Sequence, residues 1–266
     1  MHNMKHYIQI MKRLFTAIIF MLLLCVTAEA QKTYAVITGV SNYEGDANDL
    51  RQSTKDAKRL ASLYKSKGAT VVLLTSKNAT RANVIAAIRK VKATANHNDH
   101  IVFSYSGHGM ENYICTYTTA GSKMLSYNEL FSELDKCQAK DIVCYIDACF
   151  SGSATANMNT KSFDNSKDFK KYQSWQVTLK SNPRYIVFLS SRADEYSAES
   201  PLVGSGFLTN GVVKGLQGKA DSNEDKNITV IELFKYVHKD VQLHNKKQHP
   251  QLVTSKVLYD NVLMSW

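Results

Sequence analysis

The sequence has no glycine-rich phosphate loop after its first predicted strand, residues 34–40. This absence argues against a flavodoxin-like nucleotide binder, which needs such a loop to hold phosphate. The sequence also has no internal repeats, and no nucleic-acid-binding motif accompanies its formal net charge of +10. We therefore expect no nucleic-acid partner.

Long apolar runs are scarce, and the clearest one lies near the N-terminus. Leu14 to Val26 is almost wholly apolar, follows Met11-Lys12-Arg13 and precedes the small-x-small pattern Ala28-Glu29-Ala30. This order is typical of a secretory signal peptide, and the run is short for a membrane span. We predict that residues 1–30 are removed and that the protein is exported, without stable membrane association. An uncleaved anchor is the alternative.

Cysteine is also sparse, with five residues, one of which, Cys25, lies in the predicted signal peptide. A domain of this size can support its core without disulfides. Cys144 falls within a predicted strand, so we expect a packed thiol there. In an exported protein Cys115 and Cys137 would be able to pair, and the sequence leaves this open.

Apolar periodicity predicts alternating strands and helices in the first half of the chain. Strands are expected at residues 34–40, 69–75 and 99–105. Helices are expected between them, one capped by Ser53 or Thr54 and one by Thr80. This βαβαβ order predicts a parallel sheet covered on both faces.

The second half continues the pattern. A surface hairpin is predicted over residues 110–124, and a capping box of Ser126 and Glu129 then begins a helix. Later strands are predicted at 142–146 and 183–191, helices at 206–216 and from Thr229, and an edge strand within 251–254 and 257–259. No second domain is indicated, so residues 31–266 are expected to form one domain.

The predicted strand at residues 142–146 ends in chemically reactive side chains. Asp147 and Cys149 follow it two residues apart, so both should project to the same side. Ligands of open α/β sheets bind beyond the carboxyl ends of the strands. A thiol and a carboxylate at this position indicate chemistry rather than packing.

A second strand end supplies a histidine. His108 follows the predicted strand at 99–105 and lies between Gly107 and Gly109, where the backbone can come close to a ligand. A thiol needs an imidazole or another positive neighbour to become a nucleophile near neutral pH. His108 and Cys149 on adjacent strand ends would form such a pair.

The segment Tyr105-Ser-Gly-His-Gly109, followed by Asp147-Ala-Cys-Phe-Ser-Gly152, resembles the caspase and metacaspase superfamily of cysteine peptidases. The cysteine motif is more similar to the metacaspase form than to the caspase form with Gln-Ala-Cys. The resemblance spans roughly residues 33–244. It implies an α/β fold, a caspase-like three-layer α/β/α sandwich around a mainly parallel central sheet of about six strands.

The resemblance also implies a reaction. Cys149 would attack a peptide carbonyl with the help of His108, and the backbone N–H groups of Cys149 and Gly109 would stabilise the oxyanion. No third catalytic residue is evident, which suits a dyad. We expect a monomer that acts on peptides or proteins without a cofactor. The alternative is a catalytically silent caspase-like module that binds partners.

Substrate-binding residues are implied in the same way. Asp147 would line the first specificity pocket, and Asp56 lies in a stretch similar to the metacaspase segment that supplies a second acid. Two neighbouring carboxylates favour a bound cation, so we predict Arg or Lys before the scissile bond. The remaining substrate-binding residues implied by the resemblance are Ser106, Ser190 and Ser191.

Two further segments bear on regulation. Residues 221–232 partly match a calcium loop, but Lys226 replaces its glycine, and Thr229 with Glu232 forms a simpler capping box. Residues 110–128 contain one acid, Glu111, so we expect no metal site and activity without calcium. The polar segment 153–182 is long for a loop, and we predict that it is cleaved during maturation.

Overall fold

The computed structural model describes residues 31–43, 48–110, 112–118, 124–149, 182–192, 199–200 and 204–266, together with Met4, His6, Met11–Arg13 and Phe15. Contacts divide the chain into two units, Met1–Gln31 and Lys32–Trp266. The predicted signal peptide lies almost wholly outside the described residues, so its removal stays a prediction. Among the described residues, no helix has both the length and the apolar character that a membrane crossing requires.

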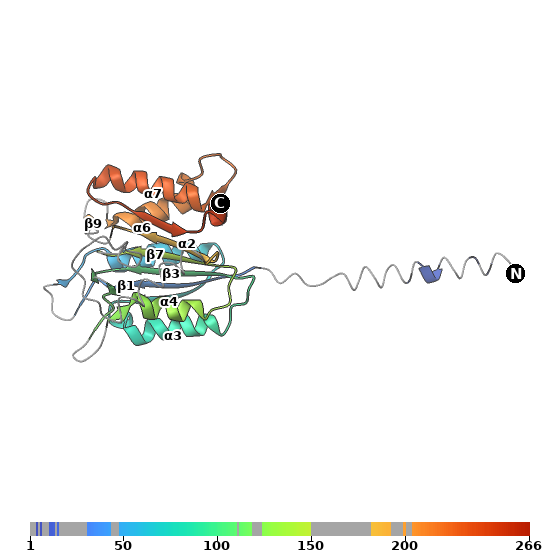
Figure 1. Ribbon diagram of the computed structural model, residues 1–266, viewed down its shortest axis with the longest axis horizontal. Helices are drawn as coiled ribbons and strands as arrows, with labels where there is room; N and C mark the ends of the chain where they lie inside the picture. The colour runs from blue at the N-terminus through green and yellow to red at the C-terminus, as the bar shows by residue number, and fades with distance from the viewer. Residues whose placement is uncertain are drawn as a thin grey trace. The chain divides into compact units, whose positions relative to one another are not determined.

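The second unit is built on a six-stranded sheet with the strand order β12-β8-β7-β3-β1-β2 (Figure 1). Its strands are β1 (Thr33–Gly39), β2 (Thr70–Thr75), β3 (His100–Ser106), β7 (Asp141–Asp147), β8 (Tyr185–Leu189) and β12 (Gln251–Thr254). Neighbouring strands pair in parallel, except that the edge strand β12 is antiparallel to β8. The prediction of a mainly parallel sheet of about six strands is confirmed.

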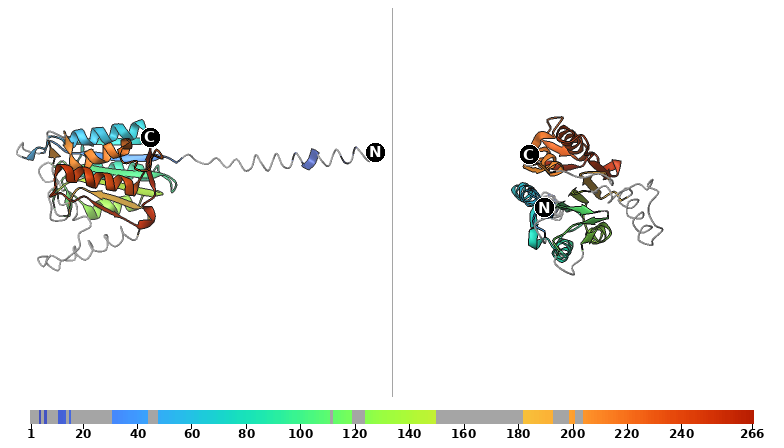
Figure 2. Two further views of the ribbon diagram at one scale, coloured as in Figure 1. Left: turned by 90° about the horizontal axis from the view of Figure 1, so that it is seen from above. Right: turned by 90° about the vertical axis from the view of Figure 1, so that its left-hand side faces the viewer.

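Helices cover both faces of this sheet. They are α2 (Ser53–Ser66), α3 (Arg81–Lys92), α4 (Tyr127–Asp135), α6 (Phe207–Lys214) and α7 (Val230–His244). In Figures 1 and 2, α3 and α4 lie on one side of the sheet, and α6 and α7 lie on the other, the side that α2 also covers. The predicted three-layer α/β/α sandwich is therefore confirmed.

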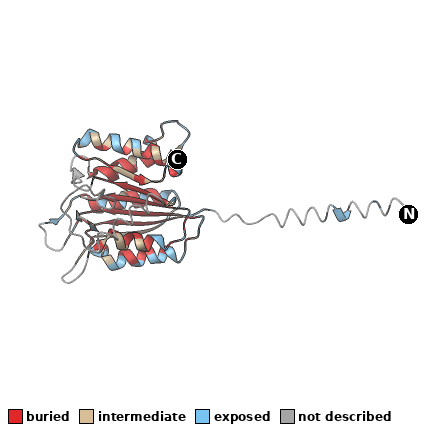
Figure 3. Ribbon diagram, viewed as in Figure 1, coloured by how far each residue is buried: buried red, intermediate tan, exposed pale blue. Residues whose placement is uncertain are grey.

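The alternation of side chains along each strand explains the two cores. In β7, Cys144 belongs to the cluster that α3 and α4 cover, whereas Val143 and Tyr145 belong to the cluster under α2, α6 and α7. Figure 3 shows the central strands almost wholly buried, while the helices are buried mainly on the sides that face the sheet. Cys144 is fully buried, which confirms the expected packed thiol.

Shorter strands form three small sheets beside the main one. The small sheets are β4 (Gly109–Met110) with β5 (Tyr113–Ile114) and β6 (Leu125–Ser126), β9 (Glu199–Ser200) with β10 (Ser205–Gly206), and β11 (Asn227–Thr229) with β13 (Val262–Ser265). The pair β4–β5 confirms the predicted hairpin. A strand at 257–259 is wrong, because Lys256–Leu258 form the 3-10 helix η5. The other short helices are η2 (Ser76–Asn78) and the π-helix η4 (Gly215–Lys219).

Two of the predicted helix starts are correct in detail. The hydroxyl of Thr80 accepts the N–H of Asn83 at the start of α3. Thr229 and Glu232 form the complete capping box at the start of α7. Each cap satisfies a backbone donor that the first helical turn would otherwise leave without a partner.

Two other helix starts differ from the prediction. Helix α2 has Gln52 at its N-cap without a side-chain cap, and Ser41 from the loop after β1 accepts the Thr54 N–H at 2.9 Å. At α4, Ser126 accepts the Glu129 N–H at 3.2 Å, but the Glu129 carboxylate bonds to Arg81 of α3, 2.8 Å from its Nε. At both helix starts, a residue distant in the sequence forms the hydrogen bond that the prediction assigned to a neighbouring residue.

Candidate active site

The two reactive side chains leave neighbouring strands at the same edge of the sheet. Strands β3 and β7 pair in parallel with Ser106 opposite Asp147, and His108 and Cys149 each follow two residues later. Both line one pocket of about 120 Å³. Asp56, Ser106 and Asp147 line the same pocket, so the structure brings together five of the predicted site residues.

Hydrogen bonds hold the backbone of His108 on both sides. Its N–H donates to the Tyr43 hydroxyl at 2.7 Å, and its carbonyl accepts from the Tyr105 hydroxyl at 2.8 Å and from the Cys115 N–H at 2.9 Å. The Tyr43 ring also lies against the imidazole, with the ring centroids 4.9 Å apart. These contacts position the imidazole from the loop after β1 and from β5.

The imidazole has a definite hydrogen-bonding partner. Its Nε2 lies 2.8 Å from the carbonyl oxygen of Asn48. A carbonyl can only accept, so this bond assigns the proton of a neutral ring to Nε2 and leaves Nδ1 as the basic nitrogen. The sequence reasoning missed Asn48, because a backbone carbonyl has no signature in the residue type.

Hydrogen bonds from the residues that follow β8 hold the loop that carries Cys149. Ser190 Oγ accepts the Ala148 N–H at 3.0 Å and donates to the Ala148 carbonyl at 2.8 Å, and Ser191 Oγ lies 3.5 Å from the same carbonyl. In turn, Gln248 donates to the Ser190 carbonyl at 2.9 Å. This network fixes the residue that precedes Cys149.

The structure places Ser190 and Ser191, which were predicted to bind substrate, against the Ala148 backbone. Both residues are 0% exposed, and neither is among the residues that line the pocket. Their hydrogen bonds indicate that both serines position the Cys149 loop, and their contact with substrate stays a prediction.

Gly109 lies too close to the Cys149 loop to carry a side chain. A Cβ built on Gly109 would lie 2.2 Å from the Cys149 carbonyl oxygen and 3.0 Å from the Ala148 Cβ. Glycine alone permits this approach of two backbones. The predicted site residue Gly109 thus packs directly against Cys149, although it does not line the pocket itself.

Asp56 enters the pocket from the first turn of α2 and is fully buried. Its carboxylate accepts from the Ser106 hydroxyl at 3.2 Å, from the Gly206 N–H at 2.9 Å and from the Ser205 hydroxyl. Burial and, secondly, the charge of Asp147 raise the pKa of Asp56 to about 7. The carboxyl is therefore poised to change its charge near neutral pH.

Asp147 is the second carboxylate that lines the pocket. It is 6% exposed and accepts both the N–H of Thr209 at 2.9 Å and the Thr209 hydroxyl at 2.8 Å. A Cβ on Gly206 would lie 2.4 Å from Asp147 Oδ2 and 3.2 Å from Asp56 Oδ2, so the two carboxylates flank that glycine. Sequence reasoning missed Ser205, Gly206 and Thr209, because these residues meet the two acids only in the folded chain.

The structure also describes the remaining thiols and the loop at residues 221–232. Cys115, Cys137, Cys144 and Cys149 are all free, so Cys115 and Cys137 do not pair.

In the loop at 221–232, Asp221 accepts the N–H groups of Asp225 and Lys226. Glu232 accepts from Ser222 as well as from Thr229. The described residues contain no cluster of three or more His, Cys, Asp or Glu arranged to hold a metal ion.

Comparison with known proteins agrees with the resemblance that the histidine and cysteine motifs indicate. A yeast relative, metacaspase-1 of Scheffersomyces stipitis, is 33% identical over 119 residues, which cover 41% of this chain and only 28% of that protein. The crystal structure of protein GSU0716 from Geobacter sulfurreducens shares the fold with a TM-score of 0.60, at 17% identity, over 88% of this chain and 98% of that one. A family model described as a caspase domain matches residues 32–261, and the chain therefore belongs to the caspase domain family of cysteine peptidases.

Proposed function

We propose that this protein is an exported cysteine endopeptidase that uses His108 and Cys149 and prefers Arg or Lys before the scissile bond. One observation carries the proposal: the pocket that both residues line is also lined by the buried carboxylates of Asp56 and Asp147. A nucleophile, a base and an acidic specificity pocket thus lie in one place. Membership of the caspase domain family supports the reaction class.

The first half of the reaction follows from the orientation of His108. Because Nε2 is bonded to Asn48, Nδ1 takes the proton from the Cys149 thiol. The thiolate forms a C–S bond with the substrate carbonyl carbon, and the carbonyl electrons move to oxygen. Backbone N–H groups of Gly109 and Cys149 would stabilise this oxyanion. Collapse breaks the C–N bond, and the leaving nitrogen takes the proton from His108.

The second half regenerates the enzyme. The acyl group remains on Cys149 as a thioester, and His108 removes a proton from a water molecule that attacks it. The C–S bond then breaks, the acid product leaves and the thiolate recovers its proton from His108. No cofactor takes part in these steps.

The acidic pocket accounts for the proposed specificity. Asp147 and Asp56 are both held by hydrogen-bond donors and are largely withdrawn from water. Two neighbouring carboxylates disfavour joint ionisation, because their negative charges repel each other. A guanidinium or ammonium group of the substrate would offset this repulsion by binding between them. An acidic substrate side chain would be repelled, so cleavage after Asp should be very weak.

We propose export from the N-terminal sequence. This proposal rests on the apolar run from Leu14 to Val26 and on the small-residue pattern that ends at Ala30. Sequencing the N-terminus of protein recovered outside the cytoplasm tests it, and a mature chain that begins at Gln31 is expected.

A peptide assay tests the activity. Aminocoumarin peptides that end in Arg, Lys or Asp are offered to the wild type and to Cys149→Ala, His108→Ala and Cys137→Ala variants. Cys137→Ala is the matched control, because Cys137 is another free thiol and precedes β7, at the opposite end of that strand from Cys149. We expect cleavage after Arg or Lys by the wild type and the control, and none by the first two variants. Wild-type rates in Cys149→Ala or His108→Ala would refute the dyad, and no activity in folded wild type would favour a silent partner-binding module.

A further inference from the structure

Three large apolar side chains stand exposed beside the catalytic strand ends. The exposed fractions are 51% for Met110, 43% for Tyr113 and 36% for Met124. We call these three residues the Met110 patch. Met110 and Tyr113 belong to the small sheet of β4, β5 and β6, and Met124 immediately precedes β6.

Strand register places the patch on the outward face of that sheet. Met110 pairs with Tyr113, and Tyr113 pairs with Ser126. The side chains of Met110, Tyr113 and Ser126 therefore share one face of the small sheet. Met124 lies two residues before Ser126 and so falls diagonally beside Tyr113 on this face. The opposite face carries Ile114 and Leu125, which are both fully buried.

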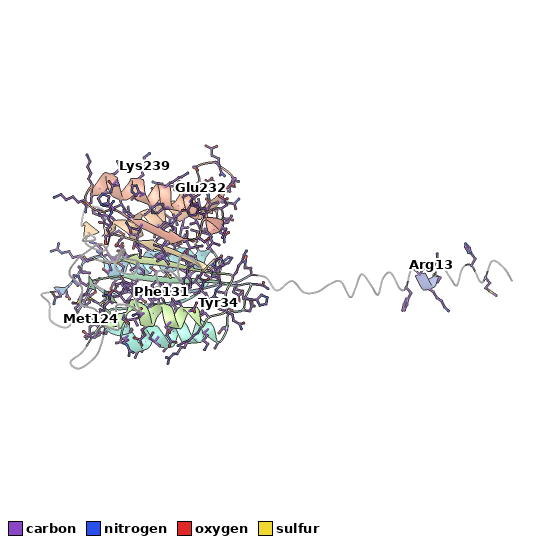
Figure 4. The ribbon with its side chains drawn as sticks, viewed as in Figure 1. Arg13, Tyr34, Met124, Phe131, Glu232 and Lys239 are labelled. Atoms are coloured by element: carbon purple, nitrogen blue, oxygen red, sulfur yellow. The ribbon has the colours of Figure 1, made fainter. Side chains whose placement is uncertain are left out.

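The patch is continuous with the active site through the backbone. Met110 directly follows Gly109, which packs against the Cys149 carbonyl. The N–H of Cys115, at the end of β5, bonds to the His108 carbonyl at 2.9 Å. Figure 4 places Met124 at the end of the main sheet opposite to Tyr34, which lies near the start of β1. His108 and Cys149 follow β3 and β7 at this same end of the sheet.

The proposed reaction sets the direction in which a substrate must lie. The residue before the scissile bond occupies the pocket of Asp56 and Asp147, whereas the leaving nitrogen must be near His108 to receive its proton. The residues after the bond therefore extend from His108 away from the acids. The element that leaves His108 is β4, which begins the Met110 patch.

The chemistry of the patch fits apolar side chains. The six strand residues of β4, β5 and β6 include no charged side chain. Exposed apolar side chains that share one face of a small sheet beside a binding pocket are typical of an interaction surface. We propose that Met110, Tyr113 and Met124 bind apolar side chains at the first and second positions after the scissile bond, an inference that rests on the proposed function.

Selectivity after the scissile bond is the quantity to measure. Two internally quenched peptides share the same residues up to Arg and then continue with Leu-Phe in one and Ser-Gly in the other. We expect wild-type kcat/KM to be about tenfold higher for the Leu-Phe peptide, the scale of discrimination that one apolar contact provides. Met110→Ser and Tyr113→Ser should each lower this ratio severalfold, and the double variant should bring it close to one.

Controls separate this inference from the proposed function. Leu243→Ser removes an equally large side chain that is 74% exposed on α7, and it should leave the ratio unchanged. Thermal unfolding verifies that each variant is folded. If the wild type cleaves an Arg aminocoumarin peptide but shows equal kcat/KM for both quenched peptides, the inference is overturned alone. If folded wild type cleaves none of these substrates, the proposed function fails with it.

Discussion

The carbonyl oxygen of Asn48 lies 2.8 Å from Nε2 of His108, and this contact determines which nitrogen of the ring can act as a base. The proposed catalytic pair of His108 and Cys149 thus has a third partner, which is a backbone carbonyl. Further support comes from Tyr43, whose hydroxyl accepts the His108 N–H at 2.7 Å, and from Tyr105 and Cys115, which both donate to the His108 carbonyl. Catalysis should therefore depend on residues that never touch the substrate.

Removal of the Tyr43 hydroxyl should lower kcat about tenfold and leave KM little changed. In Tyr43→Phe the His108 N–H loses its acceptor, a loss of about 1–3 kcal/mol that loosens the imidazole. Tyr117→Phe is the matched control, because its hydroxyl forms no hydrogen bond with the described residues. Steady-state kinetics with an Arg peptide measure the effect. Equal kcat in both variants would show that Tyr43 does not position His108.

Ser190→Ala distinguishes a positioning role from substrate binding. The change removes both hydrogen bonds to the Ala148 backbone, which are 3.0 and 2.8 Å long. We expect kcat to fall about tenfold or more, with a smaller change in KM, because the Ala148 backbone that Ser190 holds directly precedes Cys149. Ser62→Ala, at an exposed position of α2, serves as the control. A rise in KM with normal kcat would restore the substrate-binding role.

Residues 153–182, most of which lie outside the described residues, carry the prediction of maturation by cleavage. The segment offers a run of possible sites for an enzyme that cleaves after Lys, namely Lys161, Lys167, Lys170, Lys171 and Lys180. Mass spectrometry of purified wild type should find a cut within it, and Cys149→Ala protein should stay intact. An uncut chain in fully active enzyme would show that cleavage is dispensable.

Much of the fold was predictable because it depends on local periodicity. The apolar run at 142–146 became β7, with alternate side chains in the two cores, and Thr80 and Thr229 cap helices as predicted. The placement of His108 and Cys149 at one pocket was also predictable, since each follows a predicted strand by a few residues. Short-range pattern and the rule that ligands bind at carboxyl ends were sufficient for this.

The parts that escaped prediction depend on long-range contacts. Asp56 meets Ser205 and Gly206 across about 150 residues, and Glu129 leaves its own helix start for Arg81. No periodicity in a single sequence encodes such partners. The burial of Ser190 and Ser191 was missed for a related reason: resemblance places them near a substrate cleft but does not say which way they point.

The acidic pocket should make substrate preference depend on pH. The pKa of Asp56 is raised to about 7, first by burial and then by the charge of Asp147. Below pH 7 the carboxyl is protonated and neutral in the free enzyme, and above pH 7 it is ionised and attracts a cation. Binding of an Arg side chain should therefore strengthen as the pH rises through 7 and level off above it.

A ratio of two substrates isolates this ionisation from that of the dyad. Peptides that end in Arg and in citrulline have similar shape, but only Arg is charged, so changes at His108 and Cys149 act on both and cancel. We expect the Arg-to-citrulline ratio of kcat/KM to fall by up to about tenfold for each pH unit below 7. In Asp56→Asn, which cannot ionise, the ratio should be low and nearly independent of pH. A ratio that stays constant from pH 5 to 8 in the wild type would mean that Asp56 does not control recognition of the substrate charge.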